Sequence, residues 1–147
     1  MATITIDPNY GYVLLAATST FLLNTIHTFN TGKYRKAAKV DYPSAYAPSS
    51  RTDNEAHQFN CAQRAHANFI ENQPSAVGAL LLAGIRFPII SAALGAAWTV
   101  SRYVYMVGYS QGGPGGKGRY KGIYFWLFQF GLIGLAGFNG VAMVLGW

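Results

Sequence analysis

Cysteine is almost absent from this chain, which contains a single one, Cys61, among 147 residues. One thiol excludes an intramolecular disulfide, a thiolate metal site and a pair of redox-active cysteines. We also expect no metal of any other kind in this protein. Cys61 itself is interpreted as a small packing side chain rather than a redox centre.

Charged residues are also scarce, since they make up 11% of the chain whereas hydrophobic residues make up 51%. This balance is unusual for a small soluble protein and favours a lipid environment. A transmembrane helix requires about 20 mostly apolar residues. Segments of this length occur at residues 10–29, 59–85, 88–109 and 122–147. The sequence therefore predicts an all-α integral membrane protein, in which residues 1–147 form a single four-helix bundle domain.

Basic residues are concentrated in two of the predicted connections. The connection after the first helix contains Lys33, Arg35, Lys36, Lys39 and Arg51, and the connection after the third helix contains Lys117, Arg119 and Lys121. The positive-inside rule places both connections in the cytosol and both termini in the lumen. The net charge of +6 is then explained by topology and by attraction to anionic headgroups. We expect no nucleic-acid partner.

The ends of the predicted helices carry further signals. Asp7 stands where a cleavable signal would have basic residues, so the first helix is expected to act as an uncleaved insertion signal. Pro88 is expected to open the third helix, because proline is tolerated in the first helical turn. Residues 41–55 mix proline, serine, tyrosine and acidic side chains without helical periodicity, which predicts an ordered or semi-ordered loop.

Glycine occurs in two patterns. Residues 112–122 are rich in glycine, but Lys117 is not followed by Ser or Thr, so a phosphate-binding loop is a poor fit and a flexible hinge is predicted. Glycine also recurs at every third position of the last helix, at Gly131, Gly134, Gly137 and Gly140. We expect these four residues to form a ridge against which another helix packs closely.

Arg64, Asn68 and Glu71 are spaced four and three residues apart within a predicted span, so they lie along one stripe of the helix. A charge inside the membrane costs about 2.5 to 3.5 kcal/mol and is retained mainly where it faces a polar interior, a partner or a ligand. The rise from Arg64 to Glu71 is about 10.5 Å, close to the roughly 10 Å length of an extended tripeptide. Arg64 could bind a carboxylate and Glu71 could bind an ammonium group, so the pair suits a zwitterionic peptide. The alternative is an interhelical ion-pair network.

The third predicted helix presents a matching stripe. Arg102, Tyr105 and Tyr109 follow at spacings of three and four, which places a cation and two phenols on one face. Alternatively, Arg102 extends to the cytosolic interface and the tyrosines belong to an aromatic belt. His66 faces elsewhere on the second helix and is interpreted as a polar packing residue.

These motifs together resemble the MAPEG family, the membrane-associated proteins of eicosanoid and glutathione metabolism, and most closely its type-three microsomal glutathione S-transferase branch. The resemblance runs nearly end to end. It depends on residues 39–43 (KVDYP), on residues 59–68 (FNCAQRAHAN) with Glu71, and on residues 102–109 (RYVYMVGY). It implies a four-helix subunit that forms a homotrimer in the endoplasmic reticulum or a related membrane. Three glutathione sites would lie between adjacent subunits near the cytosolic surface.

The resemblance also implies roles for individual residues. Arg64, Asn68 and Glu71 match the glutathione-binding motif of the family, Tyr105 and Tyr109 match its tyrosines on the third helix, and Arg35 and Lys36 match a basic pair at the end of the first helix. Arg119 is the choice for the cation that activates the thiol, although the glycine-rich segment leaves Lys117 and Arg102 as alternatives. Asn72 departs from the family pattern, because leukotriene-synthesising relatives have tyrosine there.

The expected activity is that of a glutathione transferase with glutathione peroxidase activity. The thiol of glutathione resembles that of cysteine, which has a pKa of about 8.5. A guanidinium near this thiol would increase the thiolate fraction at neutral pH. That thiolate would attack a lipophilic electrophile or a lipid hydroperoxide, with glutathione as co-substrate and no metal. The alternatives are a non-catalytic scaffold of the same fold that binds membrane lipid and presents fatty acids to another enzyme, and a small channel component. The intact stripe of Arg64, Asn68 and Glu71 argues against the scaffold.

Overall fold

The computed structural model describes residues 6–147, and every regular element in that range is a helix. This confirms the all-α prediction. The N-terminus is predicted to be lumenal, but residues 1–5 lie outside the described range. The elements are α1 (Tyr10–Ala38), α2 (Asn54–Gly84), α3 (Pro88–Ser110), the short 3-10 helix η1 (Pro114–Gly122) and α4 (Phe125–Leu145).

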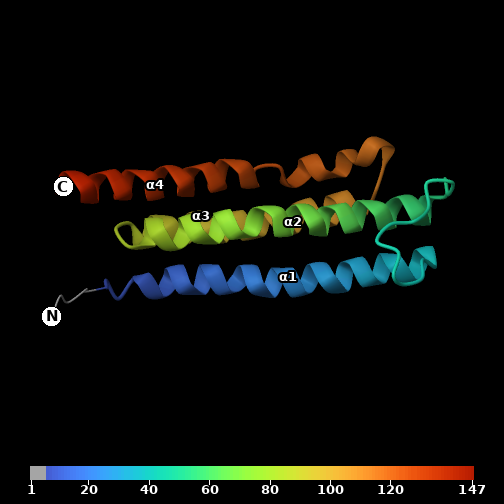
Figure 1. Ribbon diagram of the computed structural model, residues 1–147, viewed down its shortest axis with the longest axis horizontal. Helices are drawn as coiled ribbons and strands as arrows, with labels where there is room; N and C mark the ends of the chain where they lie inside the picture. The colour runs from blue at the N-terminus through green and yellow to red at the C-terminus, as the bar shows by residue number, and fades with distance from the viewer. Residues whose placement is uncertain (1–5) are drawn as a thin grey trace.

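Four long helices run alongside one another, with α2 and α3 between α1 and α4 (Figure 1). The start of α1 and the end of α4 lie at one end of the molecule, and the 39–53 connection and η1 lie at the other (Figure 1). The two basic connections therefore share one end. This arrangement agrees with the positive-inside pattern of the sequence.

Local sequence explains where the helices begin and end. Asp53 caps α2, because its side chain accepts a hydrogen bond from the backbone N–H of Ala56. Pro88 is the first residue of α3, as predicted. Pro74 lies inside α2 without interrupting it. Helix α1 continues to Ala38, nine residues beyond the predicted span that ended at residue 29, which is about 13.5 Å further along the helix axis.

The buried core is mainly apolar, but it also contains polar side chains, while large apolar side chains are exposed. Thr20, His27, Arg102, Gln129 and Asn139 are buried between the helices. Large apolar side chains are also exposed on the outside, including Leu15, Phe29, Val100, Leu127 and Val144. An apolar exterior of this extent marks a surface that contacts lipid or other protein.

Of the described helices, α4 alone is both long enough and apolar enough throughout to count as a membrane span by composition. Helices α1 to α3 fall short because their buried faces carry polar side chains such as His27, Asn72 and Arg102. Membrane crossing by these three helices stays a prediction.

The glycine ridge predicted on α4 is wrong within this chain. A Cβ atom added at Gly131 would meet Leu94, but one added at Gly134, Gly137 or Gly140 would meet nothing within 4 Å. The reason is geometric, because each residue of a helix turns by about 100° and a three-residue step falls short of a full turn by about 60°. Four glycines at this spacing therefore spiral around the helix rather than lining one face.

The hinge predicted for residues 112–122 is also corrected. Most of this segment forms η1, which packs directly on α3. A Cβ atom on Gly118 would collide with the backbone of Gly108, and one on Gly122 would collide with the backbone of Tyr105. Glycine is required here because the two main chains touch. The segment is a fixed platform.

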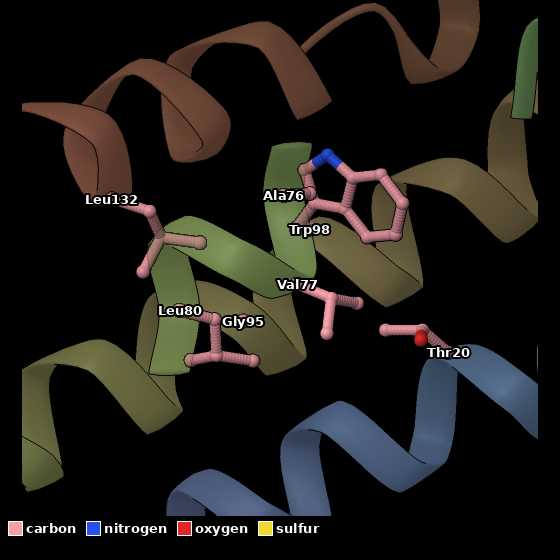
Figure 2. Close-up of a pocket in the computed structure, with 7 residues that line it drawn as sticks. All are labelled: Thr20, Ala76, Val77, Leu80, Gly95, Trp98 and Leu132. Atoms are coloured by element: carbon pink, nitrogen blue, oxygen red, sulfur yellow. The ribbon is translucent and has the colours of Figure 1, made fainter. Parts of the chain in front are cut away.

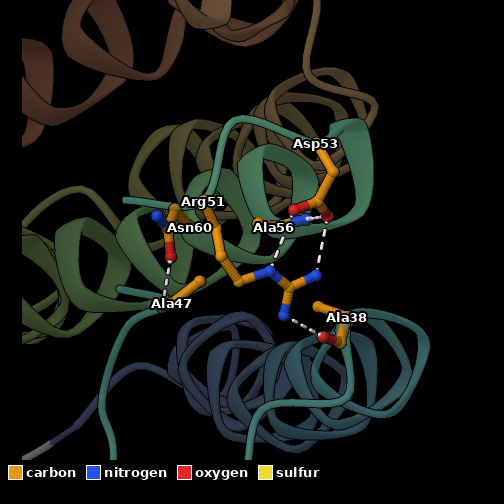
Figure 3. Close-up of polar contacts among 6 residues, drawn as sticks. All are labelled: Ala38, Ala47, Arg51, Asp53, Ala56 and Asn60. Carbon is orange, nitrogen blue, oxygen red and sulfur yellow. Dashed lines mark hydrogen bonds and ion pairs between the residues drawn. The ribbon is translucent and has the colours of Figure 1, made fainter. Parts of the chain in front are cut away.

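Residues 39–53 are held by hydrogen bonds to both neighbouring helices (Figure 3). Arg51 donates to both carboxylate oxygens of Asp53 and to the carbonyl of Ala38, at 2.9, 2.7 and 2.5 Å. The side-chain oxygen of Asn60 accepts from the backbone N–H of Ala47 at 2.8 Å. These contacts confirm an ordered loop, although α2 already begins at Asn54.

Candidate functional site

The stripe on α2 contains an ion pair. Arg64 Nη1 lies 2.9 Å from Glu71 Oε1, and Nη2 lies 3.4 Å from Oε2. Both partners are on α2, so the ion pair within this chain is intrahelical, unlike the interhelical ion-pair network considered as an alternative. Their side chains are 49% and 52% exposed, so the rest of the chain does not enclose either charge.

Asn68 lies between these two charges on α2 and connects the stripe to α3. Its side-chain oxygen accepts a hydrogen bond from Arg102 Nη1 at 2.9 Å. Its backbone carbonyl accepts one from Asn72 Nδ2 at 2.8 Å. Asn68 is half-buried, with the interior on one side and the exposed ion pair on the other.

Arg102 is completely buried, so the alternative that it extends to the membrane surface is wrong. Its guanidinium is surrounded by aromatic rings, with centroids at 4.1 Å for Phe125, 4.9 Å for Tyr105, 5.6 Å for Phe69 and 5.7 Å for Trp98. Cation–π contacts of this kind stabilise a guanidinium that has left water.

The two tyrosines of α3 lie beside Arg102 and η1. Tyr105 is buried, with its ring edge-on to Tyr109 at 5.6 Å and to Phe125 at 5.5 Å. Tyr109 is partly buried and lies 5.6 Å from the Arg119 guanidinium. The tyrosines therefore connect the α3 stripe to the platform of η1.

Arg119 is positioned by its own loop. Its Nη1 donates to the carbonyls of Gly115 and Gly116 at 2.8 and 3.2 Å, and its Nη2 donates to the Tyr120 hydroxyl at 3.0 Å. Gly115 and Gly116 adopt left-handed conformations, with φ of 62° and 63°. Lys117, the alternative candidate from the same loop, is exposed.

The predicted residues of α2, α3 and η1 converge on one region. The Arg102 guanidinium lies 4.9 Å from the centre of the Tyr105 ring, and the Arg119 guanidinium lies 5.6 Å from the centre of the Tyr109 ring. Asn68 connects these side chains to the Arg64–Glu71 pair, because it lies between the two charges on α2 and accepts a hydrogen bond from Arg102. These elements together carry three cations, Arg64, Arg102 and Arg119, and one carboxylate, Glu71, and this excess of positive charge suits an anionic ligand.

Arg35 and Lys36 are not part of this convergence. Arg35 holds the loop after α1, because Nη1 donates to the carbonyl of Ser44 at 2.7 Å and the guanidinium stacks on Tyr42 and Phe59. Both basic residues line a separate surface hollow of about 420 Å³. Within one chain, the structure leaves this basic pair apart from the α2–α3 stripe.

The middle of the helix packing offers no second site. A gap between the helices is lined by seven residues, Thr20, Ala76, Val77, Leu80, Gly95, Trp98 and Leu132 (Figure 2). It is almost wholly apolar and too narrow for a water molecule. No cluster of three His, Cys, Asp or Glu side chains occurs in the described part of the chain.

The sequence reasoning missed one contributor from α4. Gln129 is buried, accepts a hydrogen bond from Trp98 Nε1 at 3.1 Å and donates one to Ser75 at 2.8 Å. It therefore connects α4 to both α2 and α3. The available signal was a lone amide in an otherwise apolar span, since polar groups there usually make interhelical contacts.

One comparison with known proteins bears on this arrangement. A family model described as the MAPEG family matches residues 13–138. The match includes all of α2, α3 and η1, and most of α1 and α4. It therefore contains every predicted site residue from Arg35 to Arg119.

Proposed function

Because this chain belongs to the MAPEG family, we propose that it is a membrane-bound glutathione transferase with glutathione peroxidase activity, of the type-three microsomal kind. The family is membrane-associated and includes glutathione transferases together with non-catalytic members. The observation that carries the proposal is the solvent-accessible Arg64–Glu71 pair, with Asn68 beside it.

The Arg64–Glu71 ion pair can open to form two new ion pairs with a zwitterionic ligand. When glutathione binds, its glutamyl carboxylate replaces Glu71 as the partner of Arg64, and its ammonium group replaces Arg64 as the partner of Glu71. Neither Arg64 nor Glu71 is then left unpaired, which avoids the cost of an isolated charge in a partly dry site. A ligand with one charge leaves one of the two residues without a partner.

The chemistry requires a cation for the glutathione sulfur. Arg119 is our choice, because it is half-buried at the end of the Tyr105–Tyr109 face whereas Lys117 is exposed and Arg102 is committed to Asn68. Its charge favours the thiolate over the thiol. The thiolate attacks the electrophilic carbon of a lipophilic substrate to form a thioether. Alternatively, it attacks the terminal oxygen of a lipid hydroperoxide, which breaks the O–O bond and, after protonation, releases the lipid alcohol. The glutathione sulfenic acid formed in that step reacts with a second glutathione to give glutathione disulfide and water.

The proposal includes a homotrimer whose helices α1 to α4 cross the membrane of the endoplasmic reticulum or a related organelle. Arg35 and Lys36 then serve the glutathione site of an adjacent subunit. Their separation from the stripe within one chain is compatible with a shared site. Both basic connections face the cytosol, where glutathione is available.

The decisive experiment mixes detergent-purified protein with glutathione and a panel of lipophilic electrophiles and lipid hydroperoxides. Product formation and thiolate absorbance are followed together. We expect conjugation or hydroperoxide reduction that requires glutathione. Binding of lipid without turnover of either substrate class would overturn the enzyme proposal in favour of a non-catalytic lipid-binding scaffold.

A further inference from the structure

Arg102 has an unusual set of contacts for a buried cation. No part of it is exposed, and within residues 6–147 its Nε and Nη2 atoms have no hydrogen-bond partner. Its one hydrogen bond goes to the side-chain oxygen of Asn68. A well-packed apolar side chain at this position would avoid the cost of burying a charge. The arginine therefore calls for a role beyond filling space.

The contact determines how the Asn68 amide is oriented. A guanidinium has donors only, so the atom that faces Arg102 must be the carbonyl oxygen. The amide group is planar, with its oxygen and nitrogen on different sides of the carbon. Fixing the oxygen toward the interior turns the NH₂ group away from Arg102. No other described side chain or backbone atom hydrogen-bonds to that NH₂ group.

We propose that Arg102 is a positioning residue that fixes Asn68 as a hydrogen-bond donor toward the ligand. This inference rests on the proposed function, in which Asn68 lies beside bound glutathione. It adds a requirement on the ligand, because the group opposite Asn68 must be an acceptor, such as a carboxylate or a peptide carbonyl. Without Arg102, the amide is free to rotate and present its oxygen, which repels such a group.

A double-mutant cycle separates this role from a structural one. We expect Arg102→Met and Asn68→Ala each to weaken glutathione binding by about tenfold in calorimetry, the effect of losing one good hydrogen bond to a charged group. In the Asn68→Ala background, Arg102→Met should change affinity by less than about twofold, because no amide remains to be oriented. Equal losses in both backgrounds would overturn the proposal.

Two further variants keep the test decisive if Arg102→Met fails to fold. Asn68→Asp retains an acceptor for Arg102 but offers a carboxylate oxygen to the ligand, so we expect a protein at least as stable as wild type that binds glutathione more weakly than Asn68→Ala. Arg102→Lys retains one donor and should recover part of the affinity. Wild-type affinity in Asn68→Asp would overturn the proposed orientation. Absence of glutathione binding by the wild type would instead overturn the proposed function.

Discussion

The carboxylate of Asp53 has two partners, Arg51 and the first turn of α2. The hydrogen bonds from the Arg51 side chain and then the one from the Ala56 backbone lower the pKa of Asp53 from 3.8 to about 2. A carboxyl whose pKa is lower in the folded state stabilises the fold above the unfolded pKa. That contribution is lost as the pH falls from about 4 toward about 2.

Asp53→Asn tests this contribution without removing the helix cap, since asparagine also caps helices well. We expect the wild type to lose thermal stability between pH 4 and pH 2 more steeply than the variant, whereas the two curves run parallel above pH 5. Melting temperatures measured in detergent across this pH range give the answer. Parallel curves throughout would contradict the assigned role of the Arg51–Asp53 pair.

Glu71 is the proposed partner of the glutathione ammonium group. Glu71→Gln keeps the shape of the side chain and removes its charge, so we expect glutathione affinity to fall. Charged hydrogen bonds contribute about 1.5 to 3 kcal/mol, which corresponds to roughly tenfold to more than hundredfold in Kd. Isothermal titration calorimetry measures the change. Glu55→Gln, in the first turn of the same helix, is the matched control and should bind like wild type; equal affinity of the two variants would remove Glu71 from the site.

Arg119 is the proposed stabiliser of the thiolate. Arg119→Ala should raise the pKa of bound glutathione toward the value of about 8.5 for a free thiol. Turnover then falls at neutral pH and partly recovers at alkaline pH, while glutathione affinity changes much less. Thiolate absorbance and rate against pH provide the measurement, with Lys117→Ala as control. An unshifted profile for Arg119→Ala would transfer the role to Lys117 or Arg102.

At the scale of elements, the contact between η1 and α3 determines where Arg119 lies. Gly118→Ala places a Cβ atom against the backbone of Gly108, which cannot yield as a side chain would. We expect a loss of stability of about 1 to 3 kcal/mol, typical of overpacking, together with reduced turnover. Gly134→Ala, where the added methyl group meets nothing within 4 Å, is the control. Melting and activity in detergent should separate the two, and identical behaviour would mean that η1 is not held by this contact.

The helices and their order could be predicted from the sequence because apolar length and proline position are local properties. The stripe of Arg64, Asn68 and Glu71 was predictable for the same reason, since spacing along one helix determines its face. Contacts between helices were not predictable in this way. The burial of Arg102 and the link from Gln129 to Ser75 and Trp98 depend on the packing of several helices, which no single segment encodes.

At the scale of the whole molecule, the two basic connections at one end predict a defined orientation in the membrane. In a Cys61→Ser background, we expect Lys117→Cys to react with an impermeant maleimide on sealed, cytosol-side-out vesicles. Trp147→Cys should react only after the vesicles are permeabilised. Labelling of both sites in sealed vesicles would contradict a lumenal C-terminal end.

Helix α1 extends nine residues beyond its predicted span, toward the end of the molecule that carries the basic connections. This extension affects how a reaction at that end would be measured. If the helices cross the membrane as proposed, these residues and the polar first half of α2 place the proposed glutathione site at the boundary between water and lipid. The two substrates then arrive from different phases. Glutathione is counted per volume of cytosol, whereas the lipophilic partner is counted per area of membrane. Adding inert lipid at constant total substrate would dilute one reactant and leave the other unchanged.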